Sequence, residues 1–137
     1  MRKSLTFLTI LTIISAAVLS FSFNDKKIGK HLSHLYSESD QNKFTVWIYL
    51  TDKGNNTSLK LSSPLNIVSQ RSLDRRKKVK PSDKLLDITD VQVNENYIKE
   101  LNGFVNKIRI TSKWLNAVSA EIDRSQIRNI IDLKFVK

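Results

Sequence analysis

The chain has 137 residues, enough for one ordinary domain, and a formal net charge of +10. It has no cysteine, which excludes a disulfide framework, a lipid-anchored lipoprotein and thiolate metal sites. The positive charge favours acidic partners or surfaces. Nucleic acid is the usual partner of so basic a chain, but the N-terminal residues predict export, so we expect no nucleic acid.

Residues 1–22 are typical of a secretory signal peptide. Arg2 and Lys3 precede an uncharged stretch, residues 5–21, and Ser20 and Ser22 form a small-x-small cleavage pattern. The alternative is an uncleaved membrane anchor, because about 17 apolar residues approach the minimum that spans a bilayer. We expect a secreted or periplasmic protein that meets a membrane only through the transient signal peptide.

Residues 23–43 are polar and are predicted to form a linker. His31 and His34 lie three residues apart in it and could share a helical face. A stable metal site needs three or four ligands held in place, which favours solvated linker histidines. We therefore expect no metal.

The folded domain is predicted to span residues 44–137 and to begin with a strand. Residues 44–50 alternate with a period of two, so that Phe44 and Ile48 face inward while Trp47 and Tyr49 face the other way. Residues 52–56 form a turn cluster that ends this strand.

A helical insertion is expected at about residues 62–80, before Pro81. Ser63 can cap this helix and Pro64 suits its first position. Its apolar stripe is narrow and consists of Leu65, Val68, Ser72 and Leu73. Six basic residues surround the stripe, among them Arg71, Arg75 and Arg76. They form either a solvated helix face or a site for an anion or a partner.

The second half of the chain predicts a short helix, a hairpin, a helix and a last strand. Asn94 caps the first of these helices, and residues 107–122 form the hairpin with its turn at Leu115 and Asn116. Ile108, Ile110 and Trp114 are expected on one side of the first hairpin strand. In the second strand, Val118, Ala120 and Ile122 alternate with Ala117, Ser119 and Glu121. Either this is a plain hairpin, or the side that carries Ala117, Ser119 and Glu121 is shaped to dock on a partner.

The order of elements predicts an α+β fold of the ferredoxin-like, split βαβ type. Residues 127–131 supply a helix with a buried isoleucine stripe, and residues 133–136 supply the last strand. The result is a four-stranded antiparallel sheet with helices on one face. The other face would lie bare, and such a face is a usual place for a partner.

The residues that catalysis requires are missing. Three glycines are too few for a phosphate loop or a dinucleotide turn, and no Gly-x-Ser-x-Gly motif occurs. Both histidines lie in the predicted linker, so the domain has no base for a serine nucleophile. We predict that this chain is not an enzyme and needs no cofactor.

Several segments, in order and with similar spacing from about residue 44, resemble the N-terminal prodomain of secreted bacterial subtilisin-like serine proteases of Bacteroidetes-like lineages. They are Phe-Thr-Val-Trp-Ile-Tyr-Leu-Thr-Asp-Lys-Gly at residue 44, Ser-Gln-Arg-Ser-Leu-Asp-Arg-Arg at 69, Val-Gln-Val-Asn-Glu-Asn-Tyr-Ile-Lys-Glu-Leu at 91, Ser-Lys-Trp-Leu-Asn-Ala-Val-Ser-Ala at 112 and Ile-Arg-Asn-Ile-Ile-Asp-Leu-Lys-Phe-Val at 127. The second and fourth together are the most specific.

The resemblance implies a split βαβ fold and a role as intramolecular chaperone and inhibitor of a protease domain in cis. In that family the sheet packs on two helices of the protease, and a C-terminal tail lies in the substrate cleft. Here the chain ends one residue after Val136, without that tail or a protease domain. We expect a truncated precursor or a free-standing inhibitor-like module, with weak inhibition. The alternatives are an exported basic binding or adhesion module that uses residues 71–80, and a small structural domain.

Overall fold

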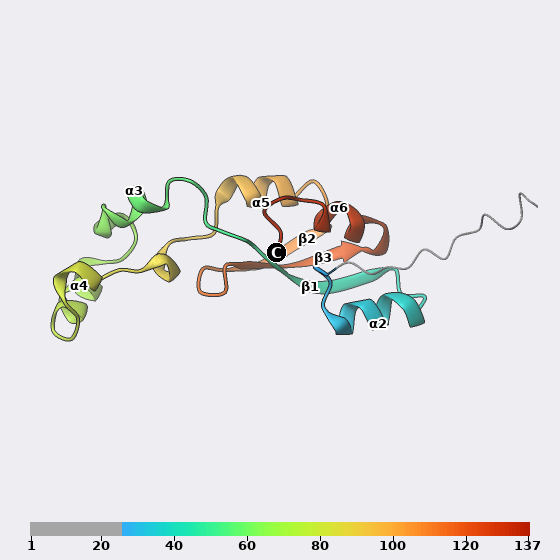
Figure 1. Ribbon diagram of the computed structural model, residues 1–137, viewed down its shortest axis with the longest axis horizontal. Helices are drawn as coiled ribbons and strands as arrows, with labels where there is room; N and C mark the ends of the chain where they lie inside the picture. The colour runs from blue at the N-terminus through green and yellow to red at the C-terminus, as the bar shows by residue number, and fades with distance from the viewer. Residues whose placement is uncertain (1–25) are drawn as a thin grey trace, which may run out of the picture.

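The computed structural model describes residues 26–137, so the predicted signal peptide lies outside the described residues. The strands are β1 (Lys43–Tyr49), β2 (Lys107–Ser112) and β3 (Ala117–Asp123). The α-helices of this part are α2 (Lys30–Glu38), α3 (Thr57–Leu61), α4 (Gln70–Lys77), α5 (Glu95–Leu101) and α6 (Ile127–Ile131) (Figure 1). Within residues 26–137, no helix has the length and apolar character needed to cross a bilayer.

The three strands form one antiparallel sheet in the order β1-β3-β2. Val46 lies opposite Ala120, and Ile48 lies opposite Val118. The alternation predicted for β1 is confirmed, because Phe44 and Ile48 are buried whereas Trp47 and Tyr49 are exposed. The mixed α+β class is therefore confirmed.

The first hairpin strand has a β-bulge that the sequence did not predict. Ile108 lies opposite Ala120, whereas Ile110 lies opposite the next residue, Ser119. The extra residue, Arg109, shifts the alternation by one position, so Ile110 turns to the face opposite Ile108. The prediction that Ile108 and Ile110 share one side was wrong.

The predicted fourth strand is reduced to a single bridge, in which Val136 pairs with Leu50 in antiparallel fashion. Thr51 N–H donates to Phe135 O at 2.9 Å, and Lys137 N–H donates to Tyr49 O at 2.9 Å. Leu133 is still part of a turn, because Val136 N–H donates to Leu133 O. Phe135 also belongs to this turn, so Val136 makes only an isolated bridge and the sheet of the described chain has three strands rather than four.

The core lies between the sheet and the two helices α5 and α6, which cover one face of it (Figure 1). Asn94 caps α5, as predicted, by accepting from Asn96 N–H at 2.9 Å. The buried cluster is formed by residues in or next to β1, α5, β3, α6 and the C-terminal end: Phe44, Ile48, Leu50, Val93, Leu101, Val118, Ala120, Ile122, Ile127, Ile130, Phe135 and Val136. The Tyr97 ring stacks on Phe135 with centroids 4.2 Å apart. This layer holds the strands in place.

The segment predicted to be a polar linker contains α2, which lies beside β1 (Figure 1). Leu32 and Leu35 are half-buried and pack against the core cluster. Both ends of this segment are tied down. Lys27 Nζ donates to Ile131 O at 2.8 Å, and Arg124 donates to Ser39 O at 2.6 Å while stacking over the Tyr36 ring.

The predicted helix at 62–80 is divided in two. Pro64 opens a short 3₁₀ turn, Pro64–Asn66, and α4 begins only after Ser69, whose hydroxyl accepts from Ser72 N–H at 3.3 Å. Ser69 rather than Ser63 is therefore the capping residue, because it provides an acceptor for the free N–H groups of α4. Of the predicted stripe, only Leu73 is buried. We name residues 55–90, which extend away from the sheet in Figure 1, the arm.

Candidate partner-docking surface

The sheet face opposite α5 and α6 is named the outer face. The register assigns to it alternate residues of each strand: Thr45, Trp47 and Tyr49 in β1, Ala117, Ser119 and Glu121 in β3, and Lys107, Ile110 and Ser112 in β2. The predicted docking residues Ala117, Ser119 and Glu121 thus share one strand face. They do not lie together with the arginines of α4, which belong to the arm.

The small residues of β3 form the floor of the outer face. Ala117 and Ser119 are buried even without a partner, because β3 is the central strand. Trp47 and Ile110 lie on either side of Ser119 in the neighbouring strands. Their exposed fractions are 44% and 60%, and that of Tyr49 is 46%. The side chains available to a partner are therefore these three rather than Ala117 and Ser119.

The turn of the hairpin carries a further exposed aromatic side chain. Trp114 is 70% exposed, and Lys113 Nζ lies 5.0 Å from its ring centroid, in the range of a cation–π contact. Asn116 adopts a left-handed backbone with φ 48°, and its side-chain amide donates to Leu50 O and Asp52 O. The turn is thus held in one place while its aromatic side chain stays exposed.

The outer face has the composition of a protein interface. Aromatic side chains are enriched in the centres of interfaces, where they bury large area at low entropic cost. Lys107 and Arg109, on the strand that carries Ile110, are exposed. This arrangement fits an apolar partner surface that has acidic residues at its border. The sequence contained this signal in Trp47 and Tyr49, but the alternation alone did not show whether they were covered.

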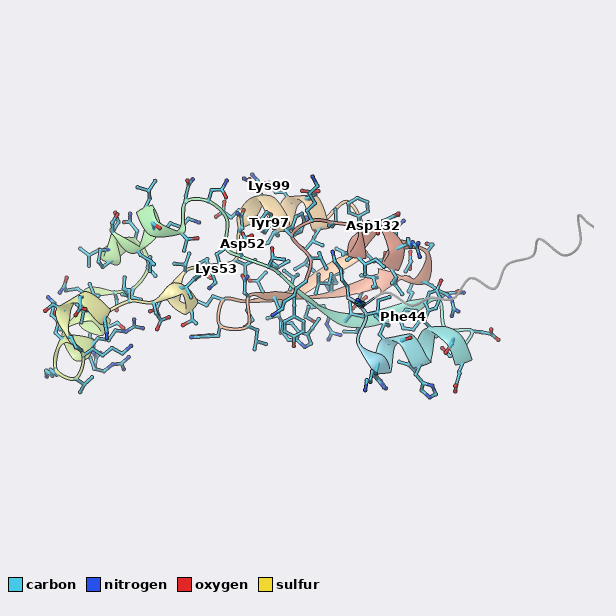
Figure 2. The ribbon with its side chains drawn as sticks, in the orientation of Figure 1. Phe44, Asp52, Lys53, Tyr97, Lys99 and Asp132 are labelled. Atoms are coloured by element: carbon cyan, nitrogen blue, oxygen red, sulfur yellow. The ribbon has the colours of Figure 1, made fainter. Side chains whose placement is uncertain are left out.

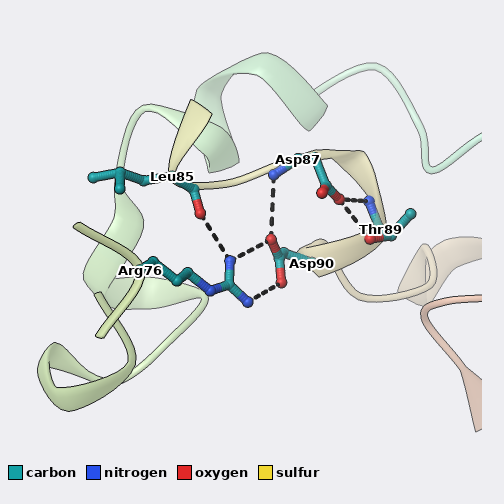
Figure 3. Close-up of polar contacts among 5 residues, drawn as sticks. All are labelled: Arg76, Leu85, Asp87, Thr89 and Asp90. Atoms are coloured by element: carbon teal, nitrogen blue, oxygen red, sulfur yellow. Dashed lines mark hydrogen bonds and ion pairs between the residues drawn. The ribbon is translucent and has the colours of Figure 1, made fainter. Parts of the chain in front are cut away.

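The three candidate arginines of the arm have different environments. Arg76 makes two parallel hydrogen bonds to Asp90, at 2.6 Å and 2.8 Å, and also donates to Leu85 O at 2.9 Å (Figure 3). Asp90 is only 4% exposed. Arg76 therefore pairs with a buried carboxylate and ties α4 to the end of the arm instead of lying on a solvated helix face, while its docking role stays a prediction.

The pKa of Asp90 is lowered chiefly by its hydrogen bonds to Arg76, against the opposing effect of burial. A second donor, Asp87 N–H, lies 3.2 Å from the same carboxylate. The pKa of Arg76 is raised by the same pairing. The ion pair is thus present at neutral pH.

Arg71 and Arg75 remain exposed on α4. Together with Ser69, Ser72, Asp74 and Lys78 they line a shallow polar hollow. Asp74 is the one acidic group of this set, and it accepts from Gln70 at 2.7 Å. These two arginines are exposed and take part in no ion pair of the described chain, and their docking role stays a prediction.

The arm joins the sheet through a buried lysine that sequence reasoning missed. Lys53 is 4% exposed, and its Nζ donates to Lys113 O at 2.6 Å and to Val91 O. Burial lowers the pKa of Lys53. Figure 2 shows Lys53 beside Asp52 and Tyr97 where the arm leaves the sheet, and the Tyr97 hydroxyl donates to Asp52 at 2.9 Å. Lys53 therefore holds the hairpin turn and the end of the arm together.

Within residues 26–137, no group of three metal-ligating side chains comes together. His34 instead contacts Glu38 at 3.0 Å on the exposed side of α2. The described residues form a small α+β domain, and its candidate binding surfaces are the aromatic outer face of the sheet and the polar hollow on α4.

The sequence matches the Peptidase S8 propeptide domain of the Bacteroidota over residues 45–137, which is well over half of the chain. The chain belongs to this family, so the predicted resemblance to a subtilisin-like protease prodomain is confirmed. It is the non-catalytic propeptide part, as predicted, and not the protease domain. No curated protein and no solved structure matches the chain. Helix α2 lies outside the matched residues.

Proposed function

We propose that the chain assists the folding of a subtilisin-like protease domain and inhibits it weakly, by docking its outer face on that domain. Membership of the propeptide family supports a partnership with a protease domain in cis. The observation that carries the proposal is the exposed cluster of Trp47, Tyr49 and Ile110 over the buried small residues of β3. Export through residues 1–22 and a secreted or periplasmic location belong to the same proposal.

The shape of the outer face explains why β3 needs small residues. The small side chains of Ala117 and Ser119 let a helical surface approach the sheet closely. Trp47 and Ile110, on either side of Ser119, then pack against both sides of that helical surface. Burying these exposed side chains offers about 1.5–3 kcal/mol each, before the cost of association.

The test is refolding of a denatured protease domain of this family with the chain added in trans. We expect the wild-type chain to raise the yield of active protease, and Ile110→Asp to lose this effect while remaining folded. Ile88→Asp is a matched control, because Ile88 is similarly exposed but lies in the arm. Equal assistance by Ile110→Asp and the wild type would show that the outer face is not the docking surface.

A further inference from the structure

A groove runs along the free edge of β1, between α2 and α6. Its volume is about 620 Å³, and its walls include Leu32 and Leu35 of α2 and Ile127, Ile130 and Ile131 around α6. β1 is an edge strand of the sheet, so within residues 26–137 its outward backbone groups have no strand beside them over most of their length. Such an edge is a template for another extended segment.

The bridge at Leu50 sets the direction and register of that segment. Tyr49 O and Thr51 N–H point outward, because they bond the C-terminal residues. Backbone groups of a strand alternate between its two edges, so those of Trp47 and Thr45 also point outward. A strand added in the same register would lie antiparallel to β1, with its side chains opposite Ile48 and Val46 turned toward the core.

The charges of the groove select the chemistry of the occupant. Lys26, Lys27, His31 and Lys137 line it, and no lining residue of the described chain is Asp or Glu. Lys137 N–H donates to Tyr49 O, so Lys137 lies where an antiparallel strand would begin, while Lys27 Nζ donates to Ile131 O on the α6 side of the groove. The rest of the lining is largely apolar.

We propose that the groove binds an extended peptide of a protein partner, which adds to β1 as an antiparallel strand. The peptide carries a carboxylate at its N-terminal end and apolar side chains on alternate residues. Its backbone bonds Trp47 and Thr45, and α2 closes over it through Leu32 and Leu35. Trp47 and Tyr49 line both this groove and the outer face, but the peptide binds the backbone edge of β1 and α2, so its binding can be measured without a protease domain.

The probe is the acetylated and amidated hexapeptide Asp-Val-Thr-Val-Thr-Val, titrated into the full chain and followed by NMR. We expect shifts and slowed hydrogen exchange for the amides of Thr45 and Trp47, and Hα–Hα contacts between a peptide valine and Val46. The same peptide N-methylated at both threonines loses the backbone donors and should bind at least tenfold more weakly. A peptide that begins with Lys should bind about two- to fivefold more weakly.

A variant provides an independent test of the edge. Thr45→Pro removes an outward N–H from an edge position, where proline is tolerated, and should abolish peptide binding. Thr45→Ala should bind as the wild type. Absence of amide shifts at millimolar peptide, or equal binding of the N-methylated peptide, would overturn the proposal. Protection of the same amides by dimerisation without peptide would also overturn it, because the occupant would then be a second copy.

Discussion

The sheet layer and the arm are held together by different forces. The sheet layer buries a continuous cluster of apolar side chains between β1, β3, α5 and α6. In the arm, Leu73 is the one buried apolar side chain among residues 55–90. The arm instead depends on directed polar contacts, among them the bidentate Arg76–Asp90 pair. The two regions should therefore respond to different perturbations.

This difference bears on what each region can do for a partner. A packed layer keeps its shape, so the outer face can present Trp47 and Ile110 in a constant geometry. An arm held by a few polar contacts opens locally at low cost, because few apolar contacts are lost on opening. We infer that the sheet supplies the precise docking surface and that the arm adapts to a partner.

The largest effect is expected for a charge placed in the sheet layer. Val118 is fully buried, so Val118→Asp leaves an unpaired carboxylate among apolar side chains. The cost of several kcal/mol is comparable with the whole stability of a small domain. We expect loss of the cooperative urea transition in circular dichroism. Ile110→Asp, on the outer face, should keep the transition, and the reverse result would mean that the two sheet faces are assigned wrongly.

A smaller and local effect is expected for Arg76→Gln. The change leaves the buried Asp90 carboxylate without its bidentate partner, which costs about 2 kcal/mol. We expect hydrogen exchange of the Leu73 amide in α4 to accelerate about 30-fold, while amides of β3 are unchanged. Arg75→Gln is the matched control and should alter neither. If β3 amides accelerate equally, the arm and the sheet unfold as one unit.

Features that arise from a local sequence pattern were predicted correctly, whereas features that depend on contacts between distant residues were not. The alternation of Phe44 and Ile48 with Trp47 and Tyr49 is a local pattern, and it predicted both faces of β1 correctly. The bulge at Arg109 was not predictable, because it depends on how β2 pairs with β3. The pairing of Arg76 with Asp90 spans fourteen residues, and in the sequence Arg76 looks like the neighbouring exposed Arg75. Lys53 and α2 were missed for the same reason, since their partners are distant in the chain.

The stability of the arm is expected to depend on pH through the ionisation of Asp90. Its folded-state pKa is lowered, mainly by Arg76, below its ordinary value of about 3.9. The ionised carboxylate therefore stabilises the arm above that value, and the contribution is lost as the pH falls through the folded pKa. Protection factors of α4 amides should drop from pH 5 to pH 2.5 in the wild type. Arg76→Gln should reduce this drop, and an equal drop in both proteins would assign it to another group.

The smallest effect on stability is expected for the exposed arginines of α4. Replacing Arg71 and Arg75 by Gln removes two charges that no ion pair of the described chain engages, so the free energy of unfolding should change by no more than about 0.5 kcal/mol. If the arm contributes to docking, the double variant should bind the protease domain more weakly at low salt. The difference from the wild type should shrink as salt rises, because the lost interaction is a screened surface attraction. Lys99→Gln removes one exposed charge on α5, on the side of the sheet away from the outer face, and is the control for charge alone. An unchanged affinity at low salt would restrict docking to the sheet, and it would leave the arm with a structural role centred on Arg76 and Asp90.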